Sequence, residues 1–218
     1  MTGFPNSPRL IKGGIVLLDP SSGAVQRVIA LQYNPDSVSR TLQVQAQGDG
    51  SGDVSEALRL KGPAIETIKL EAEMDAADYL EQPEQNPNVV QFGLHPQLAA
   101  LEALINPTSA HLTSVNGMTG SGSLEIVPAE APLTVFVWGG NRAQPVRLTD
   151  LSVTEEAFDP VLNPIRVKLN LGLRVLSVAD VGFGNRAGSL YMSYLRSREV
   201  MANRLPVGSL DMLGIGSL

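Results

Sequence analysis

The sequence predicts a mainly β protein of barrel or sandwich type, with one short internal helix and a helical extension at the C-terminus. The strongest sign is the stretch 165–175, where apolar and polar residues alternate without a break. This period of two predicts a long strand with one buried face and one wet, basic face. The 21 glycines and 15 prolines supply the turns that many strands need. Long strands build large sheets, barrels or walls, so the sequence favours an architectural role over a catalytic one.

The N-terminal part of the chain predicts three strands joined by tight turns. These short apolar or alternating segments are 15–18, 25–33 and 38–44. We expect them to form a β-meander. A stretch rich in glycine, serine and aspartate, 47–55, predicts a mobile loop after them.

A further strand is predicted at 64–74, where alternation returns. The side chains expected to point inward are Ile68, Leu70, Ala72 and Met74. Those expected to point outward are Thr67, Lys69, Glu71 and Glu73. The acidic, proline-containing stretch 75–88 is expected to be a connection.

The second half of the chain contains the internal helix and the remaining strands. Apolar residues follow helical spacing over 94–105, with Pro96 suited to a first turn and Asn106-Pro107 as a stop. Residues 108–123, rich in glycine, serine and threonine, predict a long exposed loop. Strands are expected at 133–138, 146–157 and 165–175.

The C-terminal residues differ in pattern from the strands. Apolar residues between 190 and 201 predict an amphipathic helix that ends near Asn203, and 205–218 is apolar and rich in glycine, so it needs a surface to rest on. We therefore expect a β domain over 1–178 and an extension over 179–218.

Composition bounds the function. A chain of 218 residues fits one domain with appendages. A net charge of −6 argues against general nucleic-acid binding, and the lack of cysteine excludes disulfides and thiolate metal sites. Residues 1–14 hold no apolar stretch of signal-peptide length, and no apolar run approaches the ~20 residues of a membrane span. We expect a protein made in the cytoplasm that does not contact membranes directly; release by a specialised or lytic route leaves no mark in a sequence.

No motif predicts a cofactor, a metal or an active site. Residues 182–187 fit the pattern G-x-G-x-x-A, but no second strand with an acidic residue follows, so a linker is expected. Residues 49–53 resemble the start of a calcium loop, yet Val54 and Leu60 occupy the positions that need glycine and glutamate. With His95 and His111 alone, zinc ligation would need carboxylates as well.

Charge is separated along the chain. Acidic residues cluster between 71 and 84, and seven basic residues from Arg166 to Arg204 give a basic C-terminal third. Head-to-tail contacts in a ring could use this separation for steering and register, and an ordinary solvated surface is the alternative.

Several motifs in order carry a resemblance to a known family. The segment 28–35, Val-Ile-Ala-Leu-Gln-Tyr-Asn-Pro, followed by Val38, Ser39 and Arg40, resembles the opening signature of tube-domain proteins of contractile injection systems, which are phage-tail-like particles. Matching segments follow at 60–74, 98–105, 132–139, 148–158 and 164–173. The resemblance covers roughly residues 10–178, and its order and spacing make it more specific than any single motif.

The resemblance implies a tail-tube fold and a homo-hexameric ring whose sheets pool into one inner barrel. Such rings join the spike and baseplate hub to the inner tube and have no enzymatic role. The partners implied are the spike or hub protein, the inner tube protein and other baseplate subunits. Many relatives append a LysM domain, but residues 179–218 are too short and too apolar for one.

The expected site residues follow from the pattern and the resemblance together. The family-motif turn is Tyr33, Asn34 and Pro35. The residues expected to line the lumen or a ring interface are Thr67, Lys69, Glu71, Glu73, Arg166, Lys168, Asn170 and Arg174. The loops 47–55 and 108–123 would contact neighbouring rings. In place of LysM, a tail carrying Leu190, Tyr194, Leu195 and Met201 is expected to dock on a neighbouring baseplate subunit.

Two alternatives stay open. One is the inner tube itself or its first ring, although main tube subunits tend to be shorter and to lack an extra tail. The other, from a different class, is a monomeric ligand-binding or hydrolytic β-barrel, which would show a closed pocket with convergent polar groups.

Overall fold

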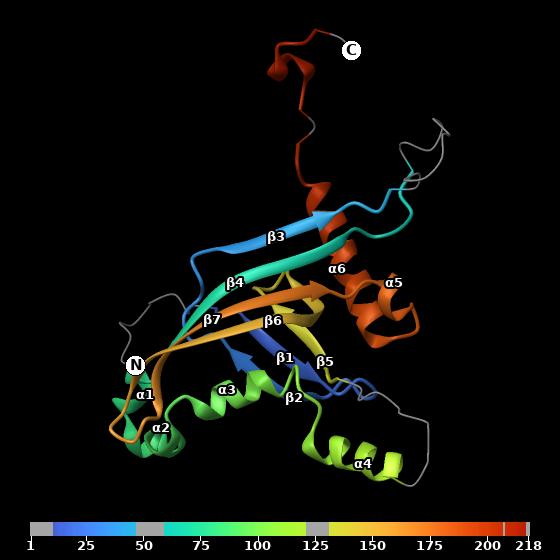
Figure 1. The fold of residues 1–218 in the computed structure, drawn as a ribbon. Helices are drawn as coiled ribbons and strands as arrows, with labels where there is room; N and C mark the ends of the chain where they lie inside the picture. Colours follow the sequence, from blue (N-terminus) through green and yellow to red (C-terminus); the bar gives the residue numbers. More distant parts are fainter. Residues whose placement is uncertain (1–10, 47–58, 121–130, 207, 217–218) are drawn as a thin grey trace.

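A single antiparallel sheet organises the molecule. The computed structural model describes residues 11–46, 59–120, 131–206 and 208–216. Its seven strands, in spatial order, are β2 (Val25–Ala30), β1 (Gly14–Leu18), β5 (Leu133–Val137), β6 (Ala143–Phe158), β7 (Pro164–Val175), β4 (Ile65–Asp75) and β3 (Val38–Gln43). The predicted mainly β class is therefore confirmed, and the long alternating stretch is strand β7 (Figure 1).

The sheet is rolled, because its two edge strands are neighbours in sequence. β2 and β3 lie at opposite edges, yet residues 31–37 join them. At roughly 3.3–3.6 Å per residue, this connection spans less than about 30 Å, so the two edges come within that distance of each other. The prediction of a three-strand β-meander was wrong: β1 pairs with β2, whereas β3 pairs with β4. Local turn residues showed where the chain breaks but not which strands pair.

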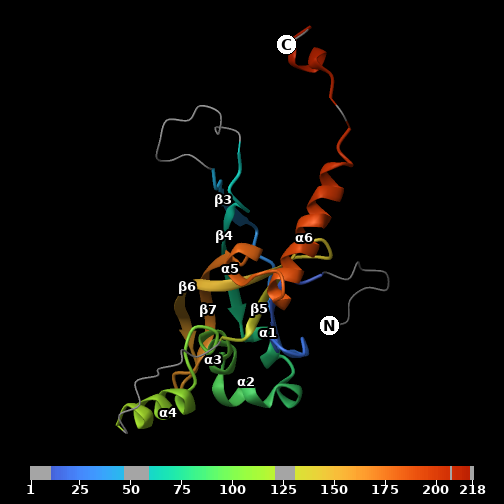
Figure 2. The same cartoon turned by 90° about the vertical axis from the view of Figure 1, so that its right-hand side faces the viewer.

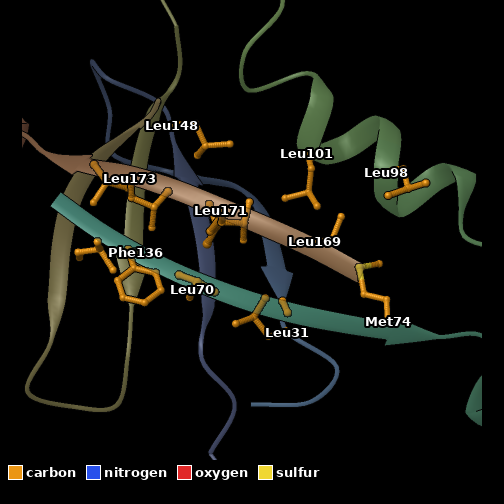
Figure 3. Close-up of a cluster of buried hydrophobic side chains, with 14 of the residues drawn as sticks. Leu31, Leu70, Met74, Leu98, Leu101, Phe136, Leu148, Leu169, Leu171 and Leu173 are labelled. Carbon is orange, nitrogen blue, oxygen red and sulfur yellow. The ribbon is translucent and has the colours of Figure 1, made fainter. Parts of the chain in front are cut away.

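The rolled sheet encloses the main core. Ile68, Leu70, Ala72 and Met74 of β4 are buried, as predicted, and they face the core beside the apolar residues of β7 (Figure 3). Phe136 of β5 and Ile15 of β1 enter the same core from the other part of the sheet. The alternating pattern therefore fixed the buried face of the long strands.

The segment between β4 and β5 holds more helix than predicted. It contains α1 (Ala77–Leu80), the 3-10 turn η2 (Pro83–Gln85), α2 (Pro87–Phe92), α3 (His95–Glu102) and α4 (Ser109–Gly120). The predicted internal helix corresponds to α3, whose Leu98 and Leu101 cover one end of the core (Figure 3).

The prediction of a loop over 108–123 was wrong where the structure describes it. Thr108 precedes helix α4 and caps its first turn: its hydroxyl accepts a hydrogen bond from His111 N at 3.2 Å, and its carbonyl accepts one from Leu112 N. A threonine at this position satisfies the free N–H groups of a first helical turn, which offsets the low helix propensity of the residues that follow.

Two helices follow the last strand. α5 (Val178–Val181) begins at the predicted domain boundary, and α6 (Arg186–Ala202) is the predicted C-terminal helix. Ala187 and Leu190 of α6 pack on the outer face of β1 and β5, while Tyr191 joins the main core. Helix α6 thus lies against the sheet at its base and projects from it at its far end (Figure 2). No helix among the described residues has the length and apolar character to cross a membrane. The division into domains 1–178 and 179–218 stays a prediction.

Candidate assembly surfaces

A polar face covers β4, β7 and β6 on the side away from the core. The ladders place Glu71 opposite Asn170, and Glu73 opposite Lys168. The sequence left open whether the polar residues of β4 or those of β7 line a common surface; the antiparallel register brings both sets together. Each of the eight expected lumen or interface residues lies on this face. Arg174 lies near the C-terminal end of β7, where it pairs with Asp180 of α5 at 2.7 Å.

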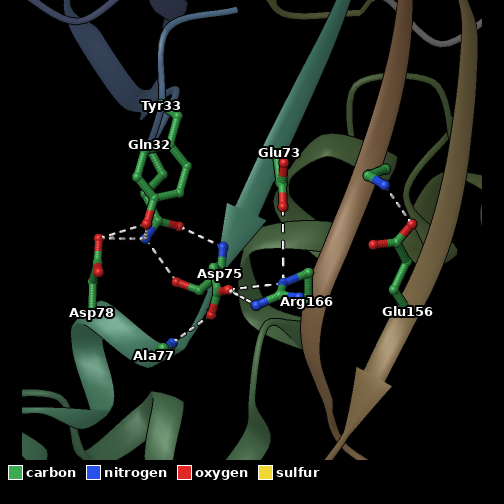
Figure 4. Close-up of polar contacts among 9 residues, drawn as sticks. Gln32, Tyr33, Glu73, Asp75, Ala77, Asp78, Glu156 and Arg166 are labelled. Carbon is green, nitrogen blue, oxygen red and sulfur yellow. Dashed lines mark hydrogen bonds and ion pairs between the residues drawn. The ribbon is translucent and has the colours of Figure 1, made fainter.

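Ion pairs cross the strands of this polar face. Arg166 Nη2 of β7 lies 2.7 Å from Asp75 Oδ2 of β4, and Arg166 Nε lies 3.8 Å from Glu73 (Figure 4). Lys168 Nζ lies 2.7 Å from Glu156 of β6. These contacts raise the pKa of Arg166, first through the hydrogen bonds that it donates to Asp75, and raise the pKa of Lys168 through Glu156. The pairs therefore link three neighbouring strands.

The charges on the polar face balance. Among the described residues, its cations and anions number five each: Lys69, Arg147, Arg166, Lys168 and Arg174 against Glu71, Glu73, Asp75, Asp150 and Glu156. The sequence suggested a basic face for β7 alone. The acidic residues of β4 and β6 neutralise it, because antiparallel pairing sets opposite charges across the ladder.

Both edges of the sheet are free within the described part of the chain and carry exposed apolar side chains. On β2, Val25 and Val28 are each 61% exposed. On and just beyond β3, Leu42 and Val44 are exposed as well. A free edge presents N–H and C=O groups that pair with another strand, and proteins commonly protect such edges with charges, prolines or a covering element. Each edge also carries one arginine, Arg27 on β2 and Arg40 on β3. The exposed valine and leucine side chains beside them make these edges suited to contact with another chain.

The family-motif turn fastens the connection between the two edges. Asn34 Oδ1 accepts a hydrogen bond from Gly13 N, and Asn34 Nδ2 donates to the carbonyl of Ile11, both at 2.9 Å. The side-chain amide thus pairs with the backbone ahead of β1 as a strand residue would. The Tyr33 hydroxyl donates to Asp78 Oδ2 at 2.9 Å, and this hydrogen bond raises the pKa of Tyr33 (Figure 4).

Gln32, next to the motif, also fastens this connection, and sequence reasoning missed it. Its Nε2 donates to the carbonyl of Asp75 at 2.7 Å, and its Oε1 accepts from Asp75 N at 2.8 Å (Figure 4). The connection is therefore tied to β1 through Asn34 and to the end of β4 through Gln32. The one available signal was a glutamine directly after the apolar residues 28–31, and the structure shows that its side chain is buried and paired.

Most of the expected docking residues of the tail pack within the chain. Tyr194 is buried, Leu195 packs against the main core and Leu190 packs on β5. Met201, beyond the region that touches the sheet, is exposed. The part of the tail left for docking is therefore the end of α6 and the residues after it.

A buried carboxylate anchors α6 to the sheet. Glu66 of β4, whose side chain is 5% exposed, lies 2.6 Å from Arg40 Nη2 of β3 and 3.7 Å from Arg198 Nη1 of α6. Arg40 also donates to the Tyr194 hydroxyl at 3.2 Å, and the guanidinium of Arg198 lies over the Tyr194 ring. The cluster joins edge strand β3, its neighbour β4 and helix α6.

The G-x-G-x-x-A motif forms the corner between α5 and α6. Gly182 ends α5 with φ of 77°, and Asn185 caps α6 by accepting a hydrogen bond from Ala187 N at 2.8 Å. A Cβ at Gly188 would collide with the Gly182 carbonyl. These contacts explain why small residues occur in this motif, and a phosphate ligand is not needed to explain them.

One further predicted site lies outside what the structure describes. The loop at 47–55, including the calcium-like 49–53, falls outside the described residues. Within the described ranges, no group of three histidine or acidic side chains is arranged to hold a metal ion.

Comparison with known proteins finds distant structural likeness alone. Neither a protein-family model nor a curated protein matches the sequence. Among solved structures, a chain from the tail of an empty gene transfer agent particle with C6 symmetry has a TM-score of 0.30 at 11% identity, and the match covers 75% of this chain and 90% of that chain. A chain from the virion of a native gene transfer agent particle gives 0.28 and 8%, with the same coverage. Likeness of this degree carries no argument about function, so the function has to be inferred from the geometry and from the sequence motifs.

Proposed function

We propose that this chain is a structural subunit of a phage-tail-like contractile particle, in which six copies form a ring that joins the spike or hub to the inner tube. One observation carries the proposal: a charge-balanced polar face on long strands lies between two sheet edges that no described residue covers and that expose valine and leucine. The sequence resemblance agrees with it. The role is non-enzymatic, and assembly is expected in the cytoplasm as part of the particle.

Ring closure would solve the problem that the free edges pose. If β2 of one copy lies beside β3 of the next, the edge N–H and C=O groups gain partners and the exposed apolar side chains are buried. Repetition around a closed rotation gives every copy the same two contacts. The rolled sheet keeps its own core, so each subunit can fold before it assembles.

The polar face would then line the bore. Its cations are paired with anions across the strands, as Arg166 is with Asp75 and Lys168 with Glu156. A bore lined by a surface with no net charge attracts neither polyanions nor polycations strongly. Such a bore suits molecules of either charge that pass through it or are held in it.

The inner tube or its first ring is the closest second candidate, because the same edges and the same bore would serve it. The C-terminal helix α6 and the residues after it favour an adaptor, since they add a projection beyond the sheet (Figure 2). Copy number separates the two: an adaptor is present as one ring per particle and a tube protein as many.

A monomeric ligand-binding barrel fits the geometry less well. The interior of the rolled sheet is filled by leucine, isoleucine, valine and phenylalanine side chains. A hollow of about 530 Å³ lies outside the core, along β4, β7 and the family-motif turn, and is lined by charged residues such as Glu71, Glu73 and Lys168. Small-molecule sites are instead enclosed and mostly apolar.

The ring is tested with edge variants. We expect the purified chain to form a sixfold ring by electron microscopy, with the mass of a hexamer by light scattering. The double variant V28K/L42K places a lysine on each edge and should abolish the ring while keeping an unchanged circular dichroism spectrum. The matched control L112K alters an exposed leucine on α4 and should keep the ring. A wild-type chain that remains monomeric in isolation and absent from any particle would contradict the proposal.

A further inference from the structure

The two ends of the long strand β7 lead to different exposed surfaces. Beyond its C-terminal end, α6 continues into a segment that extends away from the sheet in both views (Figures 1 and 2). We call this segment, the described residues 205–206 and 208–216, the arm. At the other end of β7, the β6–β7 turn (residues 159–163) lies beside α2. We call this turn, together with residues 81–92, the pole.

The arm exposes a run of large apolar side chains. Leu205 is 78% exposed, Met212 80% and Leu213 73%. Residues 210–213 form the 3-10 turn η3, so the arm has local structure although it rests on no other part of the described chain in either view. Its root is cationic on balance, since Arg196 and Arg204 are exposed near the end of α6 and outnumber the exposed Glu199. Apolar surface presented on a projecting segment indicates a docking element.

The pole exposes apolar side chains from a rigid turn. Val161 and Leu162 are each 75% exposed at the tip. The carboxylate of Asp159 holds the turn: it accepts hydrogen bonds from Val161 N and Asn163 N at 2.9 and 2.8 Å, and from Asn163 Nδ2 at 2.8 Å. The tip is therefore fixed before any partner arrives, which lowers the entropic cost of binding.

Leu162 has a strained backbone conformation that the tight β6–β7 turn imposes, since Leu162 N donates to the Asp159 carbonyl and Asp159 N donates to the Asn163 carbonyl. Its φ of 69° lies in the left-handed region, which glycine and asparagine adopt at lower cost than leucine. Its side chain contributes little to the core, because three quarters of its surface faces solvent. Glycine would meet the demand of the turn at lower cost, so an exposed leucine at this position indicates a surface contact.

The surroundings of the tip are apolar and acidic. The Asn163 side chain donates to the carbonyl of Gln91 in α2 at 3.1 Å, so the turn and α2 are neighbours. Helix α2 exposes Val90 and Phe92, and the preceding residues Glu81 and Glu84 are exposed as well. The pole thus offers apolar side chains flanked by carboxylates, which complements an apolar arm with a cationic root.

We infer that the arm of one copy docks on the pole of a second copy of this chain. The contact is heterologous, because the two surfaces differ and lie at opposite ends of β7, and it therefore links copies head to tail. It uses neither sheet edge, so it holds whether or not the proposed ring is correct. In a particle it would connect successive subunits by a link additional to edge pairing.

The test measures self-association of the full chain by analytical ultracentrifugation. Deletion of residues 205–218 and the substitution L162G should each weaken arm-dependent association by about tenfold or more, since anchor residues dominate such contacts. L162G should also leave the melting temperature unchanged or higher, because glycine relieves the strain at φ of 69°. The control L112A, which truncates an exposed leucine on α4, should change neither property.

Charge variants and edge variants complete the test. The pair E81K/E84K should weaken association, and addition of R196E/R204E should restore it in the same chain. The edge variant V28K/L42K should lose rings but keep arm-dependent association, which separates this inference from the proposed ring. Association that is unchanged by the deletion or by L162G would overturn the inference, as would failure of the reversed charges to restore it.

Discussion

Arg40 of edge strand β3 and Glu66 of β4 form an ion pair of 2.6 Å at the place where helix α6 meets the sheet. Glu66 is almost fully buried, and Arg198 of α6 lies 3.7 Å from its other oxygen. The edge strand that the ring proposal needs is therefore coupled to the helix that carries the arm. A change at this cluster affects both assembly surfaces together.

Neutralising Glu66 should loosen α6 and destabilise the chain. The substitution E66Q keeps the shape but leaves Arg40 and Arg198 without their anion, and the partial exposure of both arginines limits the cost to about 2 kcal/mol. Denaturant unfolding followed by circular dichroism measures it. The control E71Q removes an exposed carboxylate from the polar face of the same strand. Equal effects of the two substitutions would show that burial of Glu66 is not what matters.

Replacing Gln144 should stabilise the protein. This residue of β6 is completely buried, and neither its Nε2 nor its Oε1 finds a hydrogen-bond partner among the described residues. A buried amide without partners costs about 1–3 kcal/mol, so Q144M, which has similar volume, should raise the free energy of unfolding by about that amount. The exposed Q85M is the control. A loss of stability in Q144M would instead reveal a partner for the amide, such as a bound water molecule.

The sequence predicted where the strands lie and which faces they bury, but not which strands pair with each other. Alternation in β4 and β7 predicted the buried and exposed faces correctly, because a side-chain period of two is a local property. The placement of β3 beside β4 could not be predicted that way. It depends on the connection 31–37 crossing between the two edges, and the contacts of Gln32 and Asn34 that hold it are formed with residues far along the chain.

The candidate surfaces show the same limit. The polar residues of β4 and β7 were identified individually, and their charge balance appeared only when register set Glu73 beside Lys168 and Asp75 beside Arg166. Leu190, Tyr194 and Leu195 were predicted as docking residues from helical spacing. The structure uses them for packing within the chain, since an apolar stripe on a helix does not specify which surface covers it.

Asn34 should be needed for the stability of the edge connection. The substitution N34A removes the hydrogen bonds to Gly13 N and the Ile11 carbonyl, for an expected loss of about 1–2 kcal/mol in the free energy of unfolding. N34D should be no better, because a carboxylate accepts from Gly13 but cannot donate to Ile11. The exposed N141A serves as control. If both variants were as stable as wild type, the hydrogen bonds of Asn34 would not stabilise the connection.

Asp75 should make the free energy of unfolding depend on pH under acidic conditions. The hydrogen bond from Ala77 N, and after it the guanidinium of Arg166, lower the pKa of Asp75 from its ordinary value of 3.8, although partial burial opposes them. A carboxylate with a depressed folded-state pKa stabilises the native state fully above the unfolded value, and the contribution is lost as pH falls from 3.8 through the folded-state pKa. Unfolding followed between pH 2 and 7, a range of about five units around that value, should therefore show a steeper acid decline for wild type than for D75N.

The free energies of unfolding of D75N and wild type should differ most near neutral pH and converge in acid. The control E84Q, which removes an exposed carboxylate of η2, should follow the wild-type curve. Parallel curves for D75N and wild type would mean that Arg166 and Ala77 hold Asp75 no more tightly in the folded chain than in the unfolded one.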